Sequence, residues 1–132
     1  MRYMLDTNIC IYIIKNKPRQ VFQRLKEHDM SDVCISSVTY AELAYGCEKS
    51  AYADRNRVAL KLFLAGIEIL PFDIDAGEEY GRVRAGLERK GISIGSADMM
   101  IAAHAIAEDC TVVTNNTGEF VRVEGLKVEN WV

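Results

Sequence analysis

The sequence predicts an α/β fold in which a parallel sheet of about five strands is flanked by helices. Short apolar runs typical of strands alternate along the chain with longer segments whose apolar residues recur at helical spacing. Strands that are separated by helices are joined by right-handed crossovers, so the strands run parallel and the helices cover both faces of the sheet. The 132 residues, 49% of them hydrophobic, suit one domain over residues 1–132 with a substantial core.

The first third of the chain contains the signals for two strands and two helices. The apolar run at residues 3–5 predicts a first strand that ends at Asp6, and the run at 33–35 predicts a second. Residues 9–14 are apolar and favour a helix that breaks before Pro18. Pro18 itself suits the first turn of the next helix, where a backbone N–H is not needed.

Serine and glycine residues indicate where the following helices begin and end. Ser36 or Ser37 can cap the helix after the second strand, because a serine hydroxyl accepts a hydrogen bond from a free N–H of the first turn. A stripe of apolar residues over 55–65 predicts the next helix, and Gly66 is a stop signal.

The second half of the chain continues the alternation of strands and helices. Ser96 is expected to cap a helix whose MMIAAHAIA segment is apolar nearly all round, which predicts that this helix is buried. Pro71 ends a strand and Gly91 closes a polar helix. The expected segments are strands at 67–70, 111–114 and 126–128 and helices at 75–90 and 97–107.

Composition favours a cytoplasmic protein. The apolar runs are far shorter than the ~20 residues of a membrane span, and Asp6 interrupts the region where a signal peptide would be apolar. No pair of cysteines forms a CxxC motif, and apolar flanks favour buried free thiols in a reducing compartment. The four cysteines are Cys10, Cys34, Cys47 and Cys110. The net charge of −3 does not exclude nucleic acid, since binding depends on local basic groups.

Four acidic residues from separate segments are expected to meet at one edge of the sheet. Asp6 ends the first strand, Glu42 lies in the helix after the second, Asp98 begins the apolar helix, and Glu119 follows the fourth strand. Ligands of open parallel sheets bind beyond the carboxyl ends of the strands, where these residues gather. Read singly, Asp6 could be a turn or cap residue and Asp98 could complement a helix dipole, while Glu42 and Glu119 could be surface residues.

A divalent cation is the expected ligand of this acidic cluster. Carboxylates held together raise one another's pKa unless a positive charge compensates, and Mg²⁺ or Mn²⁺ prefers oxygen ligands. Asp6 and Asp98 are the first choice as direct ligands, with Glu42 binding the metal or positioning its water. The expected supporting polar residues are Thr7, Asn8, Thr114, Asn115 and Asn116.

Three other side chains near these acids have a structural interpretation. His104 follows Asp98 by six residues, which places it well round the helix, so a packed or peripheral histidine is favoured over a catalytic base. Tyr40 and Tyr45 flank Glu42 and could stack on bases, but packing between helices is the favoured interpretation.

Four ordered motifs that span essentially the whole chain resemble the PIN-domain toxins of the VapC type. They are MLDTNICIYIIKNKP, ISSVTYAELAYGCEKS, IGSADMMIAAHA and VVTNNTGEFVRVEGLKVENW. That family consists of Mg²⁺- or Mn²⁺-dependent endoribonucleases, each inhibited by a cognate VapB antitoxin. The resemblance implies that Asp6, Glu42 and Asp98 are the first three metal-binding acids. It also implies a homodimer.

The fourth acid departs from the pattern of many relatives. Asn116 occupies the place where those relatives carry an acid, so either Glu119 substitutes from three residues further on or the site works with three acids. The TNNTxEF pattern is similar to the enteric VapC subgroup, which cuts initiator tRNA in its anticodon loop. The resemblance therefore implies tRNA as the substrate.

Other classes fit the sequence less well. A phosphotransferase of the haloacid-dehalogenase type needs a second acid two residues after the nucleophilic Asp, where this chain has Asn8. A phosphorelay receiver needs an acidic pair after the first strand and an Asp that ends a later strand. A catalytically inactive PIN module that binds RNA or a protein partner remains the alternative, although the trio of Asp6, Glu42 and Asp98 argues against it.

Overall fold

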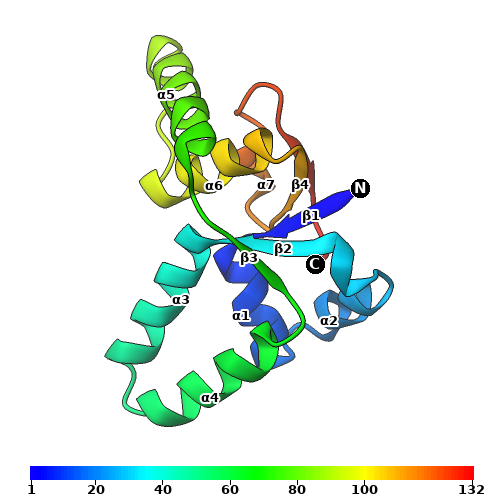
Figure 1. Ribbon diagram of the computed structural model, residues 1–132. Helices are drawn as coiled ribbons and strands as arrows, with labels where there is room; N and C mark the ends of the chain where they lie inside the picture. The colour runs from blue at the N-terminus through cyan, green and yellow to red at the C-terminus, as the bar shows by residue number, and fades with distance from the viewer.

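Five parallel strands form one sheet in the computed structural model, which describes residues 1–132 (Figure 1). The strands are β1 (Arg2–Leu5), β2 (Val33–Ser36), β3 (Glu68–Leu70), β4 (Cys110–Val113) and β5 (Lys127–Glu129). Their order is β3-β2-β1-β4-β5, and every pairing is parallel, which confirms the predicted sheet. The strand order reverses between β1 and β4, and at such a point the loops diverge and leave a crevice beyond the carboxyl ends.

Seven helices and one short 3₁₀ turn, Met30–Asp32, connect the strands. The helices are α1 (Thr7–Lys15), α2 (Arg19–Lys26), α3 (Ser37–Lys49), α4 (Ala53–Leu64), α5 (Ile74–Arg89), α6 (Ser96–Ala107) and α7 (Thr117–Phe120). Ser36, one of the two serines expected to cap the third helix, is the N-cap of α3 and accepts a hydrogen bond from the Val38 N–H. Gly91 follows α5 with φ +68°, a left-handed conformation that glycine adopts without strain.

The sheet separates two apolar cores, because successive residues of a strand point to opposite faces. On one face, Leu5 and Val113 pack with buried residues of α1, α2, α3 and α4. On the other face, Met4 and Val112 pack with residues of α5, α6 and α7. Helix α6 is buried over Ile101–Ala105, as its apolar sequence predicted.

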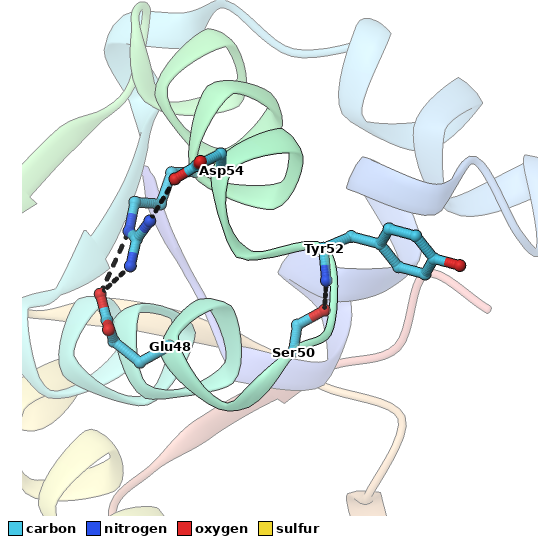
Figure 2. A network of polar contacts seen from close by, with 5 residues as sticks. Glu48, Ser50, Tyr52 and Asp54 are labelled. Atoms are coloured by element: carbon cyan, nitrogen blue, oxygen red, sulfur yellow. Dashed lines mark hydrogen bonds and ion pairs between the residues drawn. The ribbon is translucent and has the colours of Figure 1, made fainter.

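Helices α3 and α4 form an antiparallel pair that extends from the sheet on the side opposite α5 (Figure 1). Figure 2 shows the turn that joins them: Arg57 bridges Glu48 and Asp54, while the Ser50 hydroxyl accepts a hydrogen bond from the Tyr52 N–H (3.0 Å). The ring of Tyr52 is turned away from this network into solvent.

Two details correct or extend the expectations from the sequence, and the cysteines agree with them. Ser96 is not a cap, because α6 begins at Ser96 and its N-cap is Gly95, which offers no side chain. The one-turn helix α7 was not anticipated, since four residues carry too little periodicity to reveal it. All four cysteines are buried free thiols, as predicted. No helix is long and apolar enough to cross a membrane.

Candidate metal centre

Asp6 stands at the carboxyl end of β1 and caps the helix that follows. Its Oδ1 accepts a hydrogen bond from the Ile9 N–H (2.9 Å), and only 4% of the residue is exposed. Burial raises the pKa of this carboxyl, and hydrogen bonds from Thr114 and Ile9 oppose that rise. The cap role and the site role are therefore carried by the same carboxylate.

Glu42 lies on an exposed part of α3 and is tied to the first residue of α1. The Thr7 hydroxyl donates a hydrogen bond to Glu42 Oε1. The negative charge of Glu42 also contributes to the raised pKa of Asp6, so the two carboxylates are close enough to interact. The polar start of α1 thus holds the acid of α3 toward the end of β1.

Asp98 and Glu119 form the second half of the acidic cluster. Burial first, then the neighbouring Glu119, and then Asp6 and Glu42 raise the pKa of Asp98 to about 7. Glu119 is held from two sides: the Gly95 N–H donates to its Oε1 (2.7 Å), and Asn116 Nδ2 donates to its Oε2. The structure thus brings all four predicted acids into one electrostatically coupled group.

Gly95 is a site residue that the sequence did not reveal. A Cβ atom at this position would lie 3.4 Å from Asp98 Oδ2 and 3.8 Å from Glu119 Oε1, so a longer side chain would enter the space between the acids. Its contribution is a backbone N–H, which leaves no mark in a side-chain pattern. The adjoining sequence, IGSAD, shows only a small residue ahead of Asp98.

The five predicted supporting residues divide into two groups. Thr7 and Asn116 donate to Glu42 and Glu119, and the buried Thr114 hydrogen bonds with Asp6 and accepts from the Asn116 N–H (2.9 Å). Asn115 instead accepts a hydrogen bond from Asn130 Nδ2 (3.3 Å), and Asn8 is exposed without a side-chain hydrogen bond. Three of the five therefore contact the acids.

His104 and the two tyrosines lie outside the cluster. His104 is fully buried, its Nδ1 is hydrogen bonded to Ser36 Oγ (2.8 Å), and burial lowers its pKa, which confirms the structural interpretation. The packing interpretation agrees with the place of Tyr40, which lines a groove between α3 and α4 although 43% of it is exposed. It is wrong for Tyr45, which is 65% exposed. Tyr45 contacts the ammonium group of Lys49 instead of a neighbouring helix.

The donor set suits a hard divalent cation held largely by water. Four carboxylates lie close enough to interact, and burial together with the neighbouring acids raises the pKa of Asp98 to about 7, so a positive charge would relieve their repulsion. No three acidic, histidine or cysteine side chains are arranged as ligands of one ion. This is compatible with Mg²⁺, which commonly keeps several waters and binds through one or two carboxylates.

A five-stranded parallel sheet with four acids at one edge is the architecture of a PIN domain. The sequence matches the family described as "PIN domain" over residues 3–126. A tRNA(fMet)-specific endonuclease VapC from Shigella flexneri is 47% identical over 131 residues, which cover 99% of this chain and 98% of that protein. The VapBC2 complex of Rickettsia felis, bound to promoter DNA, contains a chain of the same fold (TM-score 0.93, 43% identity, 100% of both chains). The DNA-bound VapBC complex of Salmonella typhimurium contains another (TM-score 0.94, 44% identity, 100% of this chain and 99% of that one).

The chain therefore belongs to the PIN-domain family, within its group of VapC ribonucleases. The resemblance noted from the sequence motifs is confirmed over the full length of the protein. Nucleases of this group are metal-dependent, which agrees with the donor set described above.

Proposed function

We propose that the protein is the toxin of a type II toxin–antitoxin pair, a cytoplasmic endoribonuclease that uses Mg²⁺ or Mn²⁺ at the acidic cluster. The observation that carries this proposal is that four acids from separate segments interact with one another beyond the carboxyl ends of β1 and β4: Asp6, Glu42, Asp98 and Glu119. A structural role does not explain four coupled carboxylates, because their repulsion destabilises the folded state.

The acids have distinct proposed roles. Asp6 and Asp98 bind the metal directly, Glu42 binds it or positions its water, and Glu119 is the conditional fourth ligand. A divalent ion held by these acids would supply an activated water and positive charge against the phosphodiester. Thr7 and Thr114 keep Glu42 and Asp6 oriented, while Asn116 and the Gly95 N–H do the same for Glu119.

The proposed substrate is tRNA, with the anticodon loop of initiator tRNA as the first candidate. Support comes from the relatives of Shigella flexneri and Salmonella typhimurium, both named tRNA(fMet)-specific endonucleases and 47% and 44% identical to this chain. The proposed inhibitor is a VapB-type antitoxin, since the similar chains from Rickettsia felis and Salmonella typhimurium are parts of VapBC complexes. A homodimer is a further part of the proposal.

The test of the function is cleavage of transcribed tRNA by the purified protein. Wild type should cut with Mg²⁺ or Mn²⁺, lose activity in EDTA, and recover when the metal returns. Asp98→Asn should reduce cleavage by at least about a hundredfold, and the exposed Asp54→Asn should have no effect. An inactive but tightly RNA-binding wild-type protein would instead support the catalytically inactive PIN module. Cleavage that persists in EDTA would exclude the metal mechanism.

The substrate is identified by mapping RNA 5′ ends after brief induction in cells. Enrichment of one cut in the anticodon loop of initiator tRNA would support the narrower proposal. Cuts dispersed over messenger RNA in the wild-type strain, and absent from the Asp98→Asn strain, would show that messenger RNA is the substrate instead of tRNA. The proposed ribonuclease activity would still stand.

A further inference from the structure

A basic groove lies on the side of the sheet that α5, α6 and α7 cover (Figure 1). Its volume is about 390 Å³, and its walls are the second half of α5 and the loop between α7 and β5. Cationic side chains outnumber acidic ones in its lining, although the protein as a whole has a net charge of −3. The cations are Arg82, Arg89, Lys90 and Arg122, and the acids are Glu79 and Glu124.

Both acids of this basic groove are already paired with a cation. Arg82 Nη2 lies 2.6 Å from Glu79 Oε1 on the same helix. Lys90 Nζ lies 3.6 Å from Glu124 Oε2, so this pair joins the two walls. The acids therefore offset two of the four cations and leave the charges of the other two uncompensated.

The uncompensated cations are the guanidinium groups of Arg89 and Arg122. Both are exposed, and neither makes an ion pair, a side-chain hydrogen bond or a cation–π contact. Arg89 lies in the last turn of α5, where a cation is favourable to the helix dipole. That effect does not account for Arg122, which lines the same groove from the opposite wall. Two free guanidinium groups from different elements thus face one concave surface.

Both walls of the basic groove are connected to the acidic cluster at Glu119. On one side, the Arg122 N–H donates a hydrogen bond to the Glu119 carbonyl (3.2 Å), so one turn of backbone carries both residues. Three residues of helical backbone span roughly 5 Å. On the other side, the segment that follows α5 ends at Gly95, whose N–H holds the Glu119 carboxylate. The groove therefore begins beside the site.

We propose that this basic groove binds the phosphate backbone of the RNA substrate next to the scissile bond, through Arg89 and Arg122. The proposal rests on the ribonuclease function proposed above. A guanidinium presents a planar fork of N–H donors that fits two phosphate oxygens, and these two forks are not used within the protein. Four carboxylates repel a polyanion, so cations beside them are needed to bring RNA to the site.

A protein occupant is less consistent with the basic groove. The centre of a protein interface is depleted of charged residues. Six of the twelve residues that line this groove are charged. Contacts to phosphate position a nucleic acid without reading its sequence. The groove therefore holds RNA of any sequence, and the choice of the bond to be cut is left to the site.

The chain supplies two matched controls for these arginines. Arg19 is the only other arginine without an ion pair, side-chain hydrogen bond or cation–π contact, and it lies exposed on α2, which packs on the opposite face of the sheet. Arg84 lies on α5 itself but outside the lining of the basic groove. Arg19→Gln/Arg84→Gln therefore removes the same charge as Arg89→Gln/Arg122→Gln and leaves the groove intact.

Binding is measured by fluorescence anisotropy with a tRNA transcript, in an Asp98→Asn background that keeps the RNA intact. Arg89→Gln/Arg122→Gln should weaken binding at least about tenfold and reduce the slope of log affinity against log salt by about 0.7–0.9 for each arginine. Arg19→Gln/Arg84→Gln should stay within about twofold of the parent. Equal losses in the two double variants would show that only net charge matters and would overturn the proposal.

Arg89→Lys/Arg122→Lys tests the guanidinium fork separately from the charge. This variant should restore the salt dependence of the parent but only part of its affinity, because lysine contacts phosphate as a point charge. All four side chains are exposed, so neither glutamine variant should lower the melting temperature. A salt slope that stays low in the lysine variant would contradict a contact with phosphate.

A second RNA tests whether the contact is independent of sequence. An unrelated transcript of the same length should lose affinity for Arg89→Gln/Arg122→Gln by the same factor as the tRNA, within about twofold. A loss confined to the tRNA would show that the arginines read bases and would overturn the assignment to the phosphate backbone.

Kinetics separate this proposal from the proposed function. In the wild-type background Arg89→Gln/Arg122→Gln should raise KM and leave kcat nearly unchanged, because the groove binds ground state and transition state alike. If wild type does not cleave RNA, the function fails while the anisotropy comparison still decides on the groove. Unchanged RNA affinity together with a weakened antitoxin complex would assign the groove to a protein partner and overturn the proposal.

Discussion

Asp6 links stability and activity within one side chain. As the N-cap of α1 it satisfies the Ile9 N–H, and as a buried carboxylate near Glu42 it carries a raised pKa. Asparagine is as good an N-cap as aspartate, whereas alanine leaves the first turn without its hydrogen bond. The two functions of Asp6 can therefore be separated by the choice of substitution.

We expect Asp6→Asn to abolish RNA cleavage while the free energy of unfolding stays at or slightly above that of wild type. Asp6→Ala should also be inactive but less stable than Asp6→Asn by about 1 kcal/mol, the usual value of a cap. Urea denaturation of metal-free protein, followed by circular dichroism, measures the difference. Equal stability of the two variants would show that the hydrogen bond to Ile9 contributes nothing.

Asp98 should make the metal-free protein less stable as the pH rises. Its pKa is about 7 in the folded protein, against 3.8 for an unperturbed aspartate, so the folded state holds the proton more tightly than the unfolded chain does. The resulting destabilisation begins above about pH 4 and is complete above pH 7. Asp98→Asn removes this charge, so its stability gain should be largest at pH 8 and vanish near pH 4.

The measurement is the difference in unfolding free energy between wild type and Asp98→Asn in EDTA, from pH 4 to pH 8. Both proteins contain His104, whose lowered pKa makes stability fall as the pH drops below about 6.5, and this effect cancels in the difference. A difference that does not change with pH would show that the carboxyl of Asp98 titrates normally.

At the scale of elements, the start of α3 depends on a contact with α6. Ser36 caps α3 through the Val38 N–H, and the same hydroxyl is hydrogen bonded to the buried His104 of α6. Ser36→Ala removes the cap and leaves the imidazole Nδ1 without a partner, so we expect a loss of about 2 kcal/mol in unfolding free energy. Ser93→Ala, at an exposed loop position, is the control in the same denaturation experiment. A loss of less than about 0.5 kcal/mol for Ser36→Ala would contradict this account.

Elements with a strong local signal were predictable, and elements fixed by tertiary contacts were not. The strands and the buried helix α6 follow from apolar runs and periodicity. Serine is a common cap residue, so the sequence favours Ser96 as the cap of α6, whereas the helix begins at Ser96 itself and Gly95 is its N-cap. The helix α7 has only four residues, and its turn is what brings Glu119 within reach of the Gly95 N–H.

The sequence predicted which acids belong to the candidate site, but it did not predict the contacts among them. The rule that ligands bind beyond the carboxyl ends of parallel strands was enough to gather Asp6, Glu42, Asp98 and Glu119. The rule could not decide whether Asn116 or Glu119 is the fourth residue of the acidic cluster. The structure brings the carboxylate of Glu119 next to Asp98 and makes Asn116 its hydrogen-bond donor, an arrangement that depends on side-chain reach across a turn.

At the scale of the whole molecule, metal binding should stabilise the fold. An ion that binds only the folded protein adds about 1.4 kcal/mol at ten times its dissociation constant, which raises the melting temperature by about 5 °C. Differential scanning fluorimetry with and without Mg²⁺, at constant ionic strength, measures the shift. Asp98→Asn should lose most of it, and Asp54→Asn should keep it. The same shift in both variants would locate the stabilising ion away from the crevice.

Because the four acids are widely spaced along the chain, they are synthesised at different times. Glu42 leaves the ribosome early, but Glu119 follows 77 residues later, which at ordinary rates of synthesis means about 4–15 s. Strand β4, which pairs with β1, arrives in the same late stretch. A nascent chain therefore has no complete acidic edge until Glu119 and β4 have both been synthesised, so this edge forms in a single step rather than gradually with chain length.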